Sequence, residues 1–231
     1  METEVIIISG TFAPPFAIQH FPYSTLINFF NNLGYKVYME SIHLLGIGRM
    51  EKSLERIEQK YFSEARTRYI LVGHSQGGLL ALSLASEYPQ LVESVEIFGS
   101  PLYGTHMAPI WLPFPAIRAM NYRSRWLKQL RDHENLNVHK VHSYFSALDA
   151  LVVPWVASMV KSGNNHLLVP SQIRTLVEAF GRAIVGDRMA EVEVIDGLAG
   201  HIGLVTHPAI IESLSKRYFR SQKPHRLGLA T

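Results

Sequence analysis

The chain has 231 residues, of which 47% are hydrophobic and 18% are charged, a composition that excludes an intrinsically disordered protein. It contains no cysteine, which excludes disulfides and thiolate metal sites, and its formal net charge of +3 is small. No apolar run reaches the roughly 18 residues of a membrane-spanning helix. The length suits a single α/β domain over residues 1–231, without repeats, low-complexity segments or an interdomain linker.

Short apolar runs alternate along the chain with segments of helical periodicity. Six segments are predicted strands: residues 5–9, 35–39, 68–72, 92–98, 140–146 and 191–195. The first is a continuous apolar run, typical of a parallel strand buried on both faces, whereas the last alternates. Five segments carry apolar residues at helical spacing: residues 26–33, 48–66, 76–88, 176–184 and 208–218. The helix over 76–88 is apolar on nearly every side, so it should be the most buried. This alternation predicts an α/β fold with a mostly parallel sheet and helices on both faces.

Two stretches interrupt the alternation, at about residues 104–135 and about residues 155–170. They contain all three tryptophans, Trp111, Trp126 and Trp155. Both lie close in sequence to the carboxyl ends of strands, where α/β sheets bind their ligands. We interpret the first as a small apolar lid insertion beside an acyl pocket and the second as a further insertion. The alternative is additional core beneath long loops.

The sequence Gly73-His74-Ser75-Gln76-Gly77 joins a strand to the apolar helix without a gap. A serine on so sharp a turn adopts strained backbone angles, and side chains at positions 73 and 77 would collide with their surroundings. The turn raises the serine hydroxyl above the sheet and places it at a helix start, where backbone N–H groups point toward an oxyanion. We therefore predict Ser75 as a nucleophile and the N–H of Gln76 as an oxyanion donor.

A serine hydroxyl is a poor nucleophile near neutral pH, so it needs a base, and the base needs an orienting acceptor. Among eleven histidines, His201 stands out because it follows the last predicted strand on a loop, residues 198–203, that is flexible enough to bring the ring over the sheet edge. His74 is next to the serine, but its side chain leaves the turn in another direction, so we expect it to pack locally. We expect His207 to belong to the start of the helix that opens at Pro208.

Three aspartates compete for the role of the orienting acid. Asp149 directly follows the strand that ends near residue 146, so it should project at the same sheet edge as Ser75. Asp196 is only five residues from His201 and would have to fold back tightly, and Asp187 precedes its strand and belongs at the opposite edge. Asp149 is therefore the favoured acid.

These motifs resemble the α/β-hydrolase superfamily, and within it the bacterial lipase-like serine esterases, over essentially the whole chain. The order serine, acid, histidine matches Ser75, Asp149 and His201. Residues 99–105, Gly-Ser-Pro-Leu-Tyr-Gly-Thr, resemble the segment that shapes the active-site floor in lipases. The resemblance implies a compact six-stranded form that lacks the first two strands of the family. It also implies a second oxyanion donor after the first strand, Thr11, with Phe12 as the alternate.

The expected function is that of a serine carboxylic-ester hydrolase, an esterase or lipase, which acts on apolar acyl esters through an acyl-enzyme on Ser75. An acyltransferase or thioesterase that uses the same triad, and a non-catalytic lipid-binding module, are the alternatives. No cofactor, metal or nucleic-acid partner is expected.

The location and the surface partners are read from charge. The start of the chain is acidic and runs directly into an apolar strand, unlike a secretory signal, so a cytoplasmic location is expected. Two groups of basic residues, at 118–131 and 216–226, are interpreted as solvated surface, with weak contact to an anionic membrane surface as the alternative.

Overall fold

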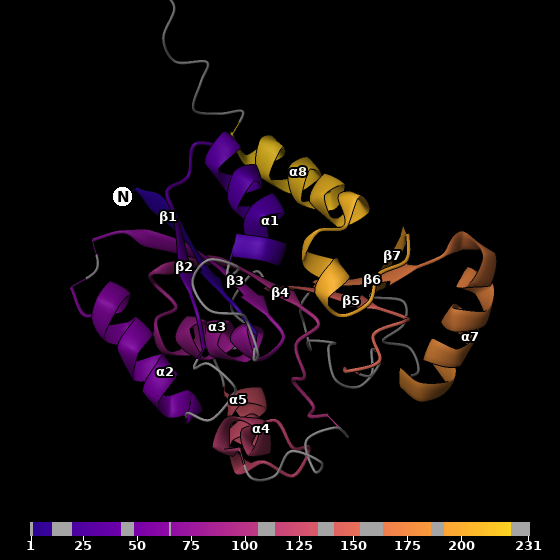
Figure 1. Ribbon diagram of the computed structural model, residues 1–231, viewed down its shortest axis with the longest axis horizontal. Helices are drawn as coiled ribbons and strands as arrows, with labels where there is room; N and C mark the ends of the chain where they lie inside the picture. Colours follow the sequence, from indigo (N-terminus) through magenta and orange to yellow (C-terminus); the bar gives the residue numbers. More distant parts are fainter. Residues whose placement is uncertain are drawn as a thin grey trace, which may run out of the picture.

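The computed structural model describes residues 2–10, 20–42, 49–64, 66–105, 114–133, 141–152, 164–185 and 192–222. Within these ranges the chain forms a seven-stranded sheet in the order β2-β1-β3-β4-β5-β6-β7, and every neighbouring pair is parallel (Figure 1). The strands are β1 (Thr3–Ile8), β2 (Val37–Glu40), β3 (Arg68–His74), β4 (Val92–Phe98), β5 (Val141–Ser146), β6 (Asn164–Val169) and β7 (Val192–Asp196).

Helices cover both faces of the sheet, as predicted (Figure 1). They are α1 (His20–Asn32), α2 (Met50–Ile57), α3 (Gln76–Glu87), α4 (Pro115–Ala119), α5 (Arg125–Asp132), α7 (Arg174–Val185) and α8 (Pro208–Gln222). Side chains from α2 to α5 meet one face of the sheet in the larger core cluster, which includes Ile6, Ile8, Leu71, Leu79, Leu80, Ile97, Ile117 and Leu127. Side chains from α1 and α8 meet the other face in a second core cluster, which includes Val5, Ile7, Phe30, Val72, Phe98, Tyr144 and Leu214.

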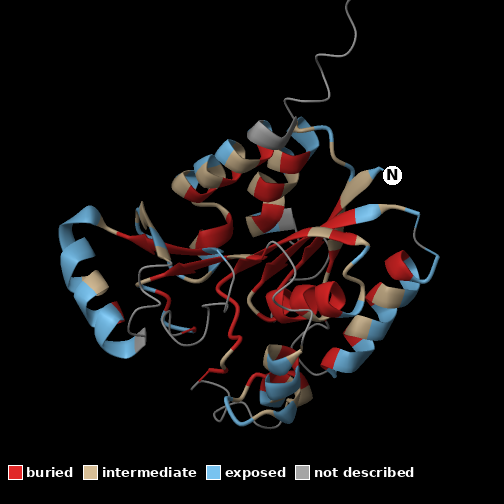
Figure 2. Ribbon diagram, turned by 180° about the vertical axis from the view of Figure 1, so that it is seen from behind, coloured by how far each residue is buried: buried red, intermediate tan, exposed pale blue. Residues whose placement is uncertain are grey.

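The burial of each strand follows its place in the sheet. Strands β1 and β3 are internal strands covered on both faces, so that Ile6, Ile7 and Leu71 are fully buried. This explains why these segments are continuous apolar runs rather than alternating ones. The predicted burial of α3 is confirmed, because nearly all of its residues are buried (Figure 2).

The predicted number of six strands is wrong, because Asn164–Val169 forms an additional strand, β6, within the stretch interpreted as the second insertion. This strand lies between β5 and β7 and is buried on both faces. It begins Asn-Asn-His, and the His166 ring is buried. Its Nδ1 lies 2.6 Å from Glu193 Oε2, and its Nε2 lies 3.1 Å from His142 Nδ1. Partnered polar residues therefore replace the apolar run by which an internal strand is normally identified.

The described part of the first interrupting stretch forms α4 and α5. Ala116, Ile117, Leu127 and Leu130 of these helices are buried and belong to the larger core cluster. Residues 106–113, with Trp111, and residues 153–163, with Trp155, lie outside the described residues.

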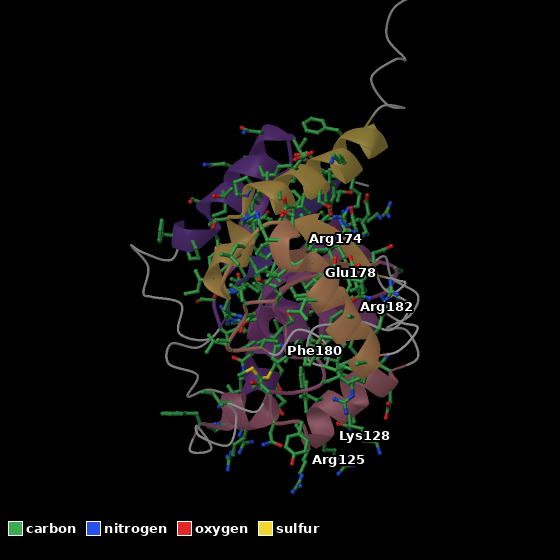
Figure 3. All side chains as sticks on the ribbon, turned by 90° about the vertical axis from the view of Figure 1, so that its right-hand side faces the viewer. Arg125, Lys128, Arg174, Glu178, Phe180 and Arg182 are labelled. Carbon is green, nitrogen blue, oxygen red and sulfur yellow. The ribbon has the colours of Figure 1, made fainter. Side chains whose placement is uncertain are left out.

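Helix α7 differs from the other helices in its exposure. Leu176 and Phe180 are 71% and 59% exposed, and Figure 3 shows Phe180 on the opposite side of α7 from Arg174, Glu178 and Arg182. Among the helices that the structure describes, none is both long and apolar enough to cross a membrane.

Candidate active site

The turn between β3 and α3 has the strained geometry that the sequence predicts. Ser75 separates His74, the last residue of β3, from Gln76, the first residue of α3. Its φ of 54° and ψ of −123° make it the one non-glycine residue with positive φ in the described part of the chain. A side chain in this region of φ/ψ space costs energy and persists only when the surroundings impose it. Here the Ser75 N–H donates to the carbonyl of Phe98 at 2.7 Å, which fixes the turn to the end of β4.

The two glycines of the turn are required by close backbone contacts. A Cβ atom on Gly73 would lie 2.3 Å from Gly78 Cα, and one on Gly77 would lie 2.2 Å from the carbonyl oxygen of Ile8. Both distances are shorter than any real contact, which confirms the predicted steric reason for Gly-x-Ser-x-Gly. A Cβ on Gly10 would lie 2.9 Å from Ser75 Cβ, so the backbone after β1 also approaches the serine closely.

Asp149 and His201 are brought together although 52 residues separate them. His201 Nδ1 lies 2.7 Å from Asp149 Oδ2, and the aspartate side chain is fully buried. The other carboxylate oxygen, Oδ1, accepts from the backbone N–H groups of Leu151 at 3.0 Å and Val152 at 2.9 Å. The orientation of the carboxylate is therefore fixed. Because a carboxylate only accepts, His201 carries its proton on Nδ1, and Nε2 is the nitrogen with a free lone pair.

The pair lies near the nucleophile turn. The imidazole rings of His74, the residue before Ser75, and His201 have centroids 4.8 Å apart. Gly99, directly after β4, has a φ of +55°, and a Cβ there would lie 3.0 Å from both Asp149 Oδ2 and His201 Nδ1. The carboxyl ends of β1, β3 and β4 thus meet the loops that carry the acid and the histidine.

The competing residues have other partners. Asp196 Oδ1 accepts the backbone N–H of Ser171 at 2.7 Å, at the start of the 3₁₀ turn before α7. Asp187 lies outside the described residues. His207 Nδ1 accepts the N–H of Ala209 at 3.3 Å, so His207 belongs to the start of α8, as expected.

The predicted oxyanion donors differ in how far the structure describes them. Gln76 is the first residue of α3, where the helix dipole favours an anion, and its side-chain Nε2 donates to the carbonyl of Ala116 in α4 at 2.8 Å. Thr11 and Phe12 lie outside the described residues.

Sequence reasoning missed the environment of His74. The ring is expected to pack locally, but its nitrogens lie at hydrogen-bonding distance from groups far along the chain, Tyr23 Oη and the carbonyl of His201. The sequence places Tyr23 and His201 far from residue 74, and we find no pattern in it that pairs them. Within the described ranges, no group of three or more His, Asp or Glu side chains is arranged to hold a metal ion.

Comparison with known sequences relates the middle of the chain to esterases. Residues 51–158 match the model of a family described as "Putative esterase". A segment of 61 residues, 26% of the chain, is 41% identical to triacylglycerol lipases from Pseudarthrobacter phenanthrenivorans and Burkholderia plantarii. That segment spans only 19% and 17% of the two lipases, respectively.

Comparison with solved structures covers nearly the whole chain. A structure from a study of two metagenome-derived lipolytic enzymes, LipS and LipT, matches 95% of this chain and 94% of its own, with a TM-score of 0.61 and 13% identity. An α/β-hydrolase from a lagoon-sediment metagenome matches 96% of this chain and 93% of its own, with a TM-score of 0.55 and 18% identity. Polyneuridine aldehyde esterase matches 96% of this chain and 99% of its own, with a TM-score of 0.53 and 14% identity.

The parallel sheet, the strained serine turn and the structural matches give the chain the α/β-hydrolase fold. Both sequence comparisons relate part of the chain to esterases and lipases.

Proposed function

We propose that the protein is a serine carboxylic-ester hydrolase that forms an acyl-enzyme on Ser75. The observation that carries this proposal is the 2.7 Å contact between His201 Nδ1 and the buried Asp149 carboxylate, beside the strained turn of Ser75. A histidine held in this tautomer offers Nε2 as a general base, and the carboxylate stabilises the imidazolium that forms. A purely structural contact between His201 and Asp149 would not explain why a strained serine lies beside it.

In the proposed reaction, Ser75 Oγ attacks the ester carbonyl while His201 Nε2 takes its proton. The N–H of Gln76 and, on the predicted assignment, that of Thr11 stabilise the oxyanion. His201 then protonates the leaving alcohol, and a water activated by the same nitrogen releases the acid and restores Ser75. No cofactor is needed for these steps.

An apolar acyl group is supported by the residues that flank the acid and the histidine. Leu148 and Leu151 on either side of Asp149 are 51% and 49% exposed, and Leu198 and Ile202 around His201 are 55% and 60% exposed. Both loops thus carry exposed apolar side chains within three residues of Asp149 or His201 in the sequence. Such a rim favours fatty acyl chains over sugars or peptides as the group bound beside Ser75.

The test is hydrolysis of p-nitrophenyl esters of increasing acyl length by the unmodified protein and three variants. We expect Ser75→Ala to lower kcat by about 10⁶-fold, because it removes the nucleophile, and Asp149→Asn to lower it by about 10⁴-fold, because it disturbs the histidine tautomer. Asp196→Asn is the matched control, since this carboxylate only accepts the N–H of Ser171, and it should retain kcat within about twofold.

Turnover that survives in Ser75→Ala, or a Ser75 that a fluorophosphonate probe does not label, would contradict the proposal. Hydrolysis that falls steadily with increasing acyl length would contradict the apolar acyl specificity alone.

A further inference from the structure

The feature that the proposed mechanism does not use is a buried chain of hydrogen bonds through His74. The His74 ring lies between α1 and the loop of His201, and only 5% of the residue is exposed. Its Nδ1 lies 2.8 Å from Tyr23 Oη, and its Nε2 lies 3.1 Å from the carbonyl oxygen of His201. The Tyr23 hydroxyl in turn accepts the backbone N–H of Gly10 at 3.1 Å.

The direction of every proton in this chain is fixed by one end. The carbonyl of His201 can only accept, so His74 carries its proton on Nε2, and its Nδ1 must accept from the Tyr23 hydroxyl. That hydroxyl keeps a lone pair for the Gly10 N–H, so each group in the chain is satisfied in a single arrangement. Burial lowers the pKa of His74 to about 3 and raises that of Tyr23 to about 12, which keeps both groups neutral over the ordinary pH range.

The chain of hydrogen bonds joins three segments that come from different strands. Gly10 follows β1 and directly precedes Thr11, the predicted oxyanion donor. His74 directly precedes Ser75. His201 is thereby held at two points, by Asp149 at its ring and by His74 at its carbonyl. A displacement of about 1 Å between reacting groups can cost a factor of about 100 in rate, so a fixed relation among these segments matters for catalysis.

We propose that Tyr23 and His74 are positioning residues for the ester hydrolysis proposed above, and that they fix the nucleophile turn and the loop of the general base relative to the segment after β1. Neither side chain reacts; each acts through the backbone to which it is bonded. The inference rests on the proposed function, and it differs from a role in core packing alone because it depends on the Tyr23 hydroxyl and on the His74 donor.

The first experiment compares Tyr23→Phe with Tyr69→Phe. Both tyrosines are almost fully buried, and Tyr69 Oη donates to the carbonyl of Tyr61 at 3.0 Å in the larger core cluster. The two variants therefore each remove one buried hydroxyl. We expect Tyr23→Phe to lower kcat by about 10- to 100-fold with KM within about twofold, and Tyr69→Phe to leave kcat within about twofold. Equal kcat values in the two variants would overturn the proposal.

The second experiment uses conservative replacement of His74. The amide nitrogen of His74→Gln can still donate to the His201 carbonyl, whereas His74→Leu fills the space without a donor. We expect the glutamine variant to retain at least about tenfold more kcat than the leucine variant. A leucine variant as active as the glutamine variant would show that only packing matters.

A spectroscopic measurement on the unmodified protein is independent of turnover. Nitrogen-15 chemical shifts of His74 should report a protonated Nε2 and a hydrogen-bonded, unprotonated Nδ1 at neutral pH. A protonated Nδ1 would overturn the proposal even if ester hydrolysis is found. If the unmodified protein turns over no ester while the shifts are as expected, the proposed function has failed and the hydrogen-bond chain stands without a catalytic role.

Discussion

At the level of single residues, backbone strain is found at Ser75, the proposed nucleophile. Its φ of 54° is a conformation that an L-amino acid adopts at a cost of order 1–3 kcal/mol. The close contacts of Gly73 and Gly77 and the hydrogen bond to Phe98 hold the residue in place. Stability is therefore given up at the position where the proposed nucleophile has to project from the sheet.

Removing the side chain at this position should stabilise the protein. Glycine adopts the Ser75 angles without strain, although it loses more chain entropy on folding, by about 0.5–1 kcal/mol. We therefore expect Ser75→Gly to unfold with a free energy about 1 kcal/mol higher than that of Ser75→Ala, which keeps the strained Cβ. Urea denaturation of the two inactive variants measures this difference. A glycine variant less stable than the alanine variant would mean that the turn is not strained.

The residues of the proposed triad could be predicted because they obey local rules. Ser75 lies in a motif with its own steric signature, and Asp149 and His201 each follow a strand, so the parallel sheet delivers them to one edge. The structure brings Asp149 and His201 together as the sequence predicts. The bonds of His74 were beyond prediction, because the tyrosine that meets its ring lies 51 positions earlier on a different element and no local rule relates the two.

At the level of elements, a buried ionic cluster fastens α8 to the sheet. Glu96 of β4 is fully buried, and Arg217 Nη1 lies 3.1 Å and 3.2 Å from its two carboxylate oxygens. Tyr218 Oη also donates to the carboxylate at 2.8 Å, and Arg217 Nη2 donates to the hydroxyl of Tyr144. Helix α8 follows the loop of His201, so this cluster fixes the element to which that loop leads.

The strength of this cluster should depend on pH. Burial raises the pKa of Glu96 from its ordinary value of 4.5 to about 7, against the opposing effect of Arg217. Between these two pH values the folded chain holds a proton on Glu96 that the unfolded chain has released. The stability that this bound proton contributes is fully present below pH 4.5 and is lost as the pH rises through about 7. Above this range the buried carboxylate is charged and relies on Arg217.

Replacing the arginine should therefore be costly mainly at higher pH. We expect Arg217→Met to lower the free energy of unfolding by about 3 kcal/mol at about pH 8, where a charged Glu96 is left buried without its partner, and by clearly less at about pH 5. Lys216→Met on the same helix is the control. Lys216 pairs with Glu212 in an exposed bridge, so its loss should cost under about 0.5 kcal/mol at either pH. An Arg217→Met penalty independent of pH would argue against a proton held by Glu96.

The elements themselves could be predicted from the sequence wherever apolar periodicity decides their structure. Residues 5–9 and 68–72 are mostly apolar because their strands are covered on both faces, and the observed strands β1 and β3 overlap both ranges. Strand β6 was not predicted from apolar composition, because its first half contains polar residues. His166 of this strand lies at hydrogen-bonding distance from His142 and Glu193. The predicted helix over 48–66 also changes its winding, from α-helix Met50–Ile57 to π-helix Glu58–Phe62, a difference to which hydrophobic spacing is insensitive.

For the whole molecule, we propose that the chain is one cooperative domain. Buried residues of α4 and α5 share the larger core cluster with β1, α2 and α3, so the first interrupting stretch has no separate core within the described residues. Trp126 packs against this cluster from α5. Its fluorescence should therefore report the same transition as the sheet.

This proposal can be tested with a variant that keeps Trp126 alone, Trp111→Phe/Trp155→Phe. We expect its urea transitions by tryptophan fluorescence and by far-ultraviolet circular dichroism to coincide, as they do for a two-state domain. The unmodified protein, followed by circular dichroism, controls for any destabilisation by the two substitutions. A fluorescence transition at lower urea would mean that α5 opens as an independent lid.

The order of the strands in the sequence also has a consequence for synthesis. A nascent chain that ends after β6 already contains the serine turn and the Asp149 turn, but it lacks β7, the loop of His201 and α8. Such a chain lacks His201, the partner of Asp149 Oδ2, and leaves the β7 side of β6 unpaired. The proposed hydrolase would therefore stay inactive on the ribosome until β7, the loop of His201 and α8 have docked, so that the step that pairs β7 with β6 also supplies the base.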